Sequence, residues 1–173
     1  MTTIRALAST DDRSTFRSGD VELDRFFTKY AGQNQFKHHI GTSYVALDDT
    51  GRILGYATVA TATLEFESLP VASRKKLPAY PLLVLRLARL AVAHDAQGQG
   101  VGSVLLEYTL GLALNMASSY GCVGVVVDAY STAMLFYIQY GFLPLEVIEG
   151  ESSARPQPTT LFLALRDVAA AGR

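Results

Sequence analysis

The sequence predicts a mixed α/β fold with helices flanking a central mixed β-sheet, and three observations carry that prediction. Apolar residues make up 49% of the chain and charged residues 18%, a balance that supports a packed core. Strand-like and helix-like runs alternate along the chain. A glycine-rich turn at 98–102 joins a long apolar strand to a helix. The length of 173 residues suits a single domain over 1–173.

The first half of the chain predicts a strand, a helix and a hairpin. Asp20 precedes apolar residues at helical spacing and is placed to cap a helix. The turn Asp48-Asp49-Thr50-Gly51 separates two apolar runs rich in β-branched residues, as in a hairpin. We therefore expect a strand at 2–7, a helix at 21–38 and strands at 42–47 and 53–64.

The second half predicts strands and helices in alternation. The run PLLVLRLARLAV at 81–92 fits a central strand, although its pattern also fits a helix. Gly141 is placed to end a short helix. We expect strands at 81–92, 123–127, 142–147 and 160–165 and helices at 100–118 and 132–140. This order predicts a mixed sheet with two parallel crossovers near its middle.

Composition and charge exclude several classes of protein. The net charge of -1 does not indicate a strongly basic nucleic-acid binder, although a local basic patch stays open. The single cysteine, Cys122, allows no internal disulfide and makes a cysteine-based zinc site unexpected, so a reducing cytoplasm fits. The N-terminus has no signal-peptide core, and no apolar run is long enough for a membrane span.

The glycine-rich turn predicts an anion site. Backbone N–H groups at a turn from strand to helix point outward, and the helix dipole adds positive charge there, which favours a phosphate. No Gly-Lys-Ser/Thr follows, so the turn is not that of a nucleoside triphosphatase. Ser103 stands where a dinucleotide motif requires its last glycine. The alternative is a glycine-rich turn with no ligand.

The motif Gln97-Gly98-Gln99-Gly100-Val101-Gly102 resembles the acetyl-CoA loop of the GCN5-related N-acetyltransferases, the GNAT superfamily. The order of the surrounding segments agrees with that family. A strand at 89–92 precedes the loop, a strand at 124–129 follows the helix, and a tyrosine-bearing helix leads into Gly141-Phe142. Tyr130 departs from the family, because many relatives have asparagine there.

The resemblance implies direct transfer of acetyl from acetyl-CoA, as cosubstrate, to a primary amine, with no metal. Tyr137 is the candidate general acid, since a phenol with a pKa of about 10 is protonated at neutral pH; the alternative is a core aromatic. No general base is assigned, although His94, Asp95 and Asp128 lie near the loop and the second strand in sequence. The strand end would pair with the pantetheine arm through Leu90, Ala91 and Val92. The loop would bind the pyrophosphate, and its residues are Gln97, Gly98, Gln99, Gly100, Val101, Gly102 and Ser103.

Stretches at 16–35, 86–92, 125–129 and 161–165 look like the bacterial GNAT toxins of toxin–antitoxin pairs, and the likeness covers 20–165. It implies acetylation of the α-amino group of aminoacyl-tRNA and a ribbon-helix-helix antitoxin. That antitoxin would bind DNA, so the toxin contacts DNA only through it. Relatives are often homodimers.

A tRNA substrate needs a positive surface. Two of the candidate residues, Arg86 and Arg89, interrupt an apolar strand and point to opposite faces, so one can pair internally while the other reaches the substrate. The substrate-binding candidates are Arg74, Lys75, Lys76, Arg86 and Arg89, with Lys29 and Lys37 on the first helix. An ordinary solvated face is the alternative for 74–76.

Two other functions stay open. One is a GNAT enzyme that acetylates a small amine or a protein amine. The other is a non-catalytic module that only binds acetyl-CoA. Tyr137 in the family position argues against the second.

Overall fold

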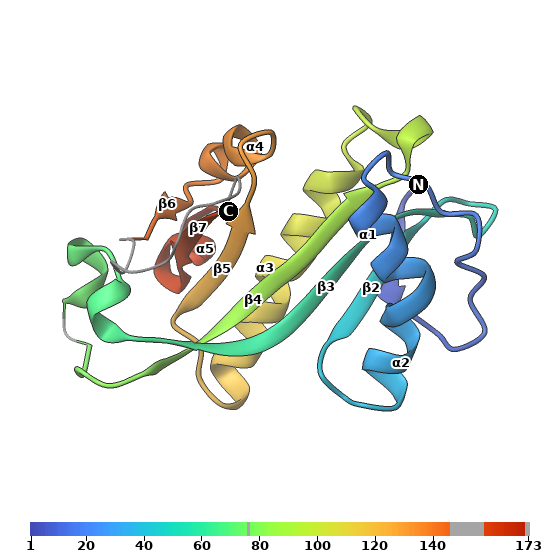
Figure 1. Ribbon diagram of the computed structural model, residues 1–173. Helices are drawn as coiled ribbons and strands as arrows, with labels where there is room; N and C mark the ends of the chain where they lie inside the picture. The colour runs from blue at the N-terminus through green and yellow to red at the C-terminus, as the bar shows by residue number, and fades with distance from the viewer. Residues whose placement is uncertain (76, 146–157, 172–173) are drawn as a thin grey trace. The chain divides into compact units, whose positions relative to one another are not determined.

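The computed structural model describes residues 1–75, 77–145 and 158–171, and these residues form a sheet with the strand order β1-β2-β3-β4-β5-β7-β6 (Figure 1). The strands are β1 (Thr3–Ala6), β2 (Thr42–Leu47), β3 (Ile53–Leu64), β4 (Leu82–Val92), β5 (Gly124–Ala129), β6 (Leu143–Pro144) and β7 (Thr159–Ala164). The helices are α1 (Val21–Arg25), α2 (Ala31–Phe36), α3 (Val101–Ser119), α4 (Met134–Gln139) and α5 (Leu165–Ala171). The mixed α/β fold is therefore confirmed.

The chain divides into two compact units that share its long elements. Unit 1 comprises Met1–Ala60 and Leu87–Gly111, and unit 2 comprises Thr61–Arg86 and Leu112–Arg173. Strands β3 and β4 and helix α3 each contribute one part to each unit. The single domain over 1–173 stays a prediction. Within the described ranges, no helix is long and apolar enough to cross a membrane.

The hairpin of unit 1 has the bounds that the sequence predicts. β2 pairs antiparallel with both β1 and β3. The Asp48 carboxylate organises the turn, because its Oδ1 accepts from the backbone N–H of Thr50 at 2.9 Å and of Arg52 at 3.0 Å. Gly51 has φ +86°, a left-handed conformation that glycine adopts without strain.

The single helix expected at 21–38 is instead three consecutive helical segments. A π-helical turn, η1 (Phe26–Tyr30), separates α1 from α2, and the run ends at Phe36. Asp20 caps α1 as predicted, since its Oδ1 accepts from the backbone N–H groups of the second and third helical residues. A π turn holds more residues than an α turn, so the adjacent Phe26 and Phe27 can both face the core, and both are buried.

The second crossover, from β5 through α4 to β6, joins two strands that are not neighbours in the sheet. β7 pairs antiparallel with both β5 and β6 and therefore lies between them. The apolar residues Leu161 to Leu163 of β7 are fully buried, which favours this inner position. Gly124 of β5 permits the pairing, because a Cβ there would lie 2.3 Å from the Leu163 carbonyl oxygen. The expected strand at 142–147 is described only to Leu145, and α5 was not expected.

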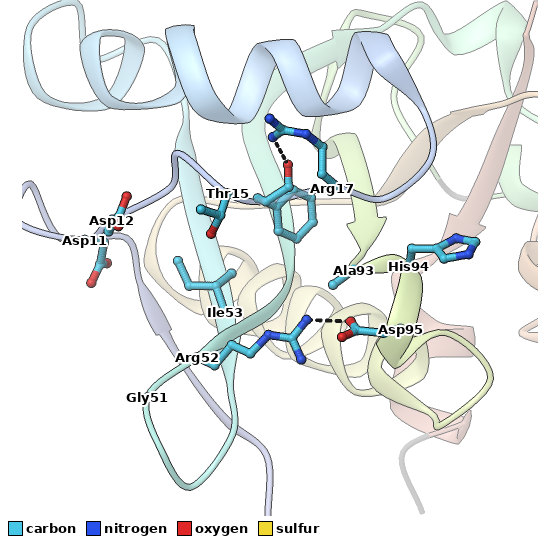
Figure 2. A pocket seen from close by; sticks show the side chains of 11 residues that line it. Asp11, Asp12, Thr15, Arg17, Gly51, Arg52, Ile53, Ala93, His94 and Asp95 are labelled. Carbon is cyan, nitrogen blue, oxygen red and sulfur yellow. Dashed lines mark hydrogen bonds and ion pairs between the residues drawn. The ribbon is translucent and has the colours of Figure 1, made fainter.

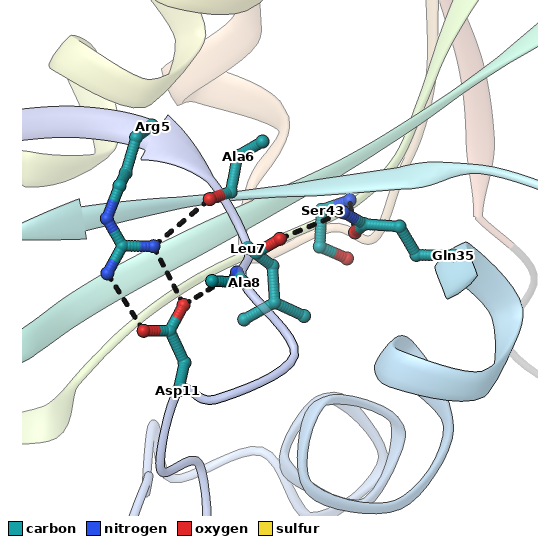
Figure 3. A network of polar contacts seen from close by, with 7 residues as sticks. All are labelled: Arg5, Ala6, Leu7, Ala8, Asp11, Gln35 and Ser43. Atoms are coloured by element: carbon teal, nitrogen blue, oxygen red, sulfur yellow. Dashed lines mark hydrogen bonds and ion pairs between the residues drawn. The ribbon is translucent and has the colours of Figure 1, made fainter.

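An ion pair joins Arg5 of β1 to Asp11 in the segment that follows the strand (Figure 3). Two nitrogens of the Arg5 guanidinium donate to the two Asp11 carboxylate oxygens, each at 2.8 Å. The backbone N–H of Ala8 donates to the same carboxylate at 2.8 Å. These contacts, the hydrogen bond from Arg5 first, lower the pKa of Asp11 below its ordinary value.

The lowered pKa of Asp11 predicts a pH-dependent contribution to stability. The ionised carboxylate stabilises the fold above its unfolded pKa of about 3.9, and this contribution is lost as the pH falls through the lower folded-state pKa. The free energy of unfolding, measured with urea at several pH values from about 7 to 2, should fall more steeply for the wild type than for Asp11→Asn. Parallel curves would contradict this expectation.

Candidate active site

The predicted anion site lies at the start of α3 in unit 1. The chain leaves β4, passes through a 3-10 turn, η4 (His94–Ala96), and reaches the glycine-rich turn before Val101. Gly98 has φ +77° and Gly100 has φ +85°, and a Cβ on either would meet open space. The backbone conformation therefore requires these glycines, and neighbouring protein atoms do not.

The turn presents bare backbone to an open side. The Val104 N–H donates to the Gly100 carbonyl at 3.1 Å, and the N–H groups of Val101, Gly102 and Ser103 precede this first α-helical bond. Such N–H groups at a helix N-terminus, together with the helix dipole, attract anions. The arrangement fits a pyrophosphate, with no side chain required to hold it.

Gln97 serves the turn in a way that the motif did not predict. Its Nε2 donates to the Ser18 carbonyl at 2.8 Å and to the Val92 carbonyl at 3.1 Å. The side chain is thus turned toward the protein. Gln99 is exposed, and its amide makes a long contact of 3.4 Å with the Asp95 carbonyl.

The end of β4 is the other part of the predicted cofactor site. Ala91 is buried, while Leu90 and Val92 are half-buried. A Cβ on Gly55 of β3 would lie 2.8 Å from the Ala91 carbonyl oxygen, so glycine is needed for β3 to pack here. Pairing of this strand end with a pantetheine arm stays a prediction.

Tyr137 lies on α4 in unit 2, and the residue is 5% exposed. The ring packs edge-on against Phe136 at a centroid distance of 5.1 Å and against Phe142 at 5.6 Å. Burial raises the pKa of the Tyr137 phenol above its ordinary value, so the group is protonated at neutral pH, as a proton donor must be. Tyr130 is 58% exposed. Tyr137 and the glycine turn belong to different units, so their cooperation stays a prediction.

The carboxylates considered as bases are engaged in ion pairs. In unit 2, Asp128 of β5 accepts from the Arg86 guanidinium and, at 2.7 Å, from the Thr160 hydroxyl. In unit 1, Asp95 pairs with Arg52 at 2.5 Å, and this hydrogen bond lowers the pKa of Asp95. Both carboxylates therefore already have a cationic partner.

The two arginines of β4 have different partners. Arg86 makes the internal pair that the sequence predicts for one of them, although its side chain is half-exposed and not buried. The Arg89 guanidinium carbon lies 3.7 Å from the centroid of the Phe26 ring, a cation–π contact that orients the charge without neutralising it.

The basic segment after β3 is only partly available to a substrate. Arg74 donates to the Leu69 carbonyl at 2.9 Å and to the Glu67 carbonyl at 2.6 Å, so it stabilises its own turn. Lys75 is exposed, and Lys76 lies outside the described residues.

A pocket of about 510 Å³ lies in unit 1 beside the segment that leads into the glycine turn (Figure 2). Several of its charged groups satisfy one another or the backbone: Arg52 pairs with Asp95, and Arg17 donates to the Phe16 carbonyl. The sequence did not predict the pocket, because its walls come from segments far apart in the chain. Its lining residues are Asp11, Asp12, Thr15, Phe16, Arg17, Gly51, Arg52, Ile53, Ala93, His94 and Asp95.

Residues 39–144 match the family model of the acetyltransferase (GNAT) domain, which covers more than half of the chain. The chain therefore belongs to the GNAT acetyltransferase family. This confirms the family that the loop motif and the order of the segments predict.

Within this family, the chain is similar to several toxins. The chain is 33% identical over 141 residues to the tRNA-acetylating toxin of Mycobacterium tuberculosis. The aligned residues cover 80% of this chain and 82% of that toxin. The structure of AtaT complexed with acetyl-methionyl-tRNAfMet is 26% identical, with a TM-score of 0.86 over 100% of both chains. The structure of AtaTR bound with AcCoA is 27% identical, with a TM-score of 0.81 over 99% of this chain and 98% of that one.

Proposed function

We propose that this chain transfers the acetyl group of acetyl-CoA to the α-amino group of aminoacyl-tRNA and so acts as a translation-blocking toxin. The observation that carries the proposal is the 33% identity to a tRNA-acetylating toxin over four-fifths of both chains. The open glycine turn at the start of α3 supports acetyl-CoA as the cosubstrate, because it offers backbone donors to a pyrophosphate.

The proposed cofactor contacts are made largely by backbone. The N–H groups from Gly98 to Ser103 bind the pyrophosphate. The strand end from Leu90 to Val92 pairs with the pantetheine arm and polarises the thioester carbonyl. Binding of AcCoA by the similar AtaTR supports this assignment.

The transfer proceeds by direct attack of the amine on the thioester carbonyl carbon. The new C–N bond forms, the C–S bond breaks, and Tyr137 gives its phenolic proton to the departing thiolate. The α-amine of an aminoacyl ester is more acidic than a lysine amine, so more of it is neutral at pH 7. Water takes the proton that the amine loses, which fits the engagement of Asp95 and Asp128 in ion pairs.

The tRNA contact is assigned to two basic residues that make no ion pair within the described parts of the chain. Arg89, oriented by the Phe26 ring, and the exposed Lys75 bind phosphate groups. The AtaT structure that contains acetyl-methionyl-tRNAfMet supports a charged tRNA as substrate. Charged tRNA also implies a cytoplasmic protein.

The proposed partners follow the toxin assignment. A ribbon-helix-helix antitoxin covers the toxin and binds operator DNA, so the toxin contacts DNA only through it.

The test is acetylation of bulk charged tRNA. Purified protein, acetyl-CoA and charged tRNA are mixed, the tRNA is digested, and the products are analysed by mass spectrometry. We expect N-acetylated aminoacyl-adenosine, and its amino acid identifies the preferred tRNA. Acetylation of polyamines or peptide amines, with none on tRNA, would overturn the proposal.

A further inference from the structure

We propose that Ser18 and Asp24 are positioning residues for the glycine turn and that they set the affinity for acetyl-CoA through Gln97. This inference rests on the proposed acetyl-CoA site. It concerns the N-terminal segment of unit 1, which contains none of the predicted cofactor contacts.

The first step is the use of the Gln97 amide. A side-chain amide nitrogen carries two hydrogens. Gln97 donates them to the carbonyls of Ser18 at 2.8 Å and Val92 at 3.1 Å. Neither hydrogen is left for a phosphate oxygen, so Gln97 acts on the cofactor only by fixing where the turn begins.

The second step is the fixation of Ser18 itself. Ser18 is 8% exposed. Its backbone N–H donates to the two Asp24 carboxylate oxygens at 2.9 and 3.1 Å, and its hydroxyl donates to Oδ1 at 2.7 Å. Hydrogen bonds to an ionised carboxylate are stronger than neutral ones. Asp24 on α1 therefore holds Ser18 in place while the Ser18 carbonyl accepts from Gln97.

A second link joins the same two segments. The backbone N–H of His94, at the start of η4, donates to the Arg17 carbonyl at 2.8 Å. Residues 17–18 thus hold both ends of the segment 94–97, which leads directly into the glycine turn.

The consequence is preorganisation of a costly stretch of backbone. Gly98 and Gly100 lose much conformational freedom when the turn is ordered. A turn that is already anchored at Gln97 loses less freedom when acetyl-CoA binds, and so binds more tightly. The anchors do not touch the reacting atoms, so their loss should raise the KM for acetyl-CoA and leave kcat unchanged.

The test measures acetyl-CoA binding by calorimetry for Asp24→Asn, Ser18→Ala and Gln97→Met. Losing one such link should weaken binding about five- to thirtyfold, with kcat at saturating acetyl-CoA within about twofold of the wild type. Asp20→Asn is the matched control. It removes the same charge from the same segment, and asparagine still caps α1. It should bind acetyl-CoA as the wild type does.

A double-mutant cycle separates positioning from general loosening. If Asp24 acts through Gln97, adding Asp24→Asn to Gln97→Met should cause little further loss of affinity. Additive losses, or variants that bind like the wild type, would overturn the inference. If Asp24→Asn does not fold, Ser18→Ala in the Gln97→Met background decides in the same way. A wild-type protein that does not bind acetyl-CoA would instead overturn the proposed function.

Discussion

Replacement of Tyr137 by phenylalanine should lower the rate of acetyl transfer about 10²- to 10⁴-fold, the usual contribution of a general acid. The variant keeps the buried ring between Phe136 and Phe142 and removes only the hydroxyl. The thiolate must then leave without a proton from the protein. Binding of acetyl-CoA should be unchanged, because the pyrophosphate contacts belong to the glycine turn. Single-turnover transfer to charged tRNA and calorimetry measure the two quantities.

Tyr140→Phe is the control for this substitution. It removes a hydroxyl from the residue that follows α4, whose ring also packs against Phe136, at 5.6 Å. We expect activity like that of the wild type. A large loss of activity in Tyr140→Phe, with full activity in Tyr137→Phe, would show that Tyr137 is not the general acid. Because burial raises the pKa of Tyr137, loss of its phenolic proton should not lower kcat until the pH exceeds about 10.

The sequence predicts most accurately the elements whose signals are local. β2 and β3 have the predicted bounds of 42–47 and 53–64, because the strand pattern ends at a turn defined by Asp48 and Gly51. The turn before α3 was likewise identified from its glycines alone. In these places a few adjacent residues determine the backbone.

The features that the sequence could not predict depend on partners distant in the chain. β7 lies between β5 and β6, and β6 is the edge strand. The residue pattern of β7 alone does not determine which of the two strands pairs with β5. The π turn at Phe26 depends on what both rings pack against.

Part of the candidate site is also hidden from the sequence. Gln97 was recognised from its motif, but its partner Ser18 lies 79 residues away, so no local spacing could identify the contact. Arg86 and Arg89 could be singled out as unusual in an apolar strand. Which of them pairs with a carboxylate depended on Asp128 of another strand.

Replacement of Gly100 by alanine should weaken acetyl-CoA binding at least about tenfold, because it changes the backbone that binds the pyrophosphate. Gly100 has φ +85°, where a side chain costs about 1–2 kcal/mol. The strained residue either shifts toward negative φ, which redirects the N–H groups, or keeps its φ and places a methyl group on the open side. Both outcomes harm the anion site.

Gly51→Ala is the matched control for Gly100→Ala. Gly51 has φ +86° in the β2–β3 turn, and a Cβ there also meets open space, so the two substitutions impose the same backbone strain in the same unit. Urea unfolding should therefore give similar losses of stability for both variants, while calorimetry should give a higher Kd for acetyl-CoA only for Gly100→Ala. Equal effects on binding would mean that general strain, and not the local backbone, governs affinity. Unchanged binding in both would remove the glycine turn from the cofactor site.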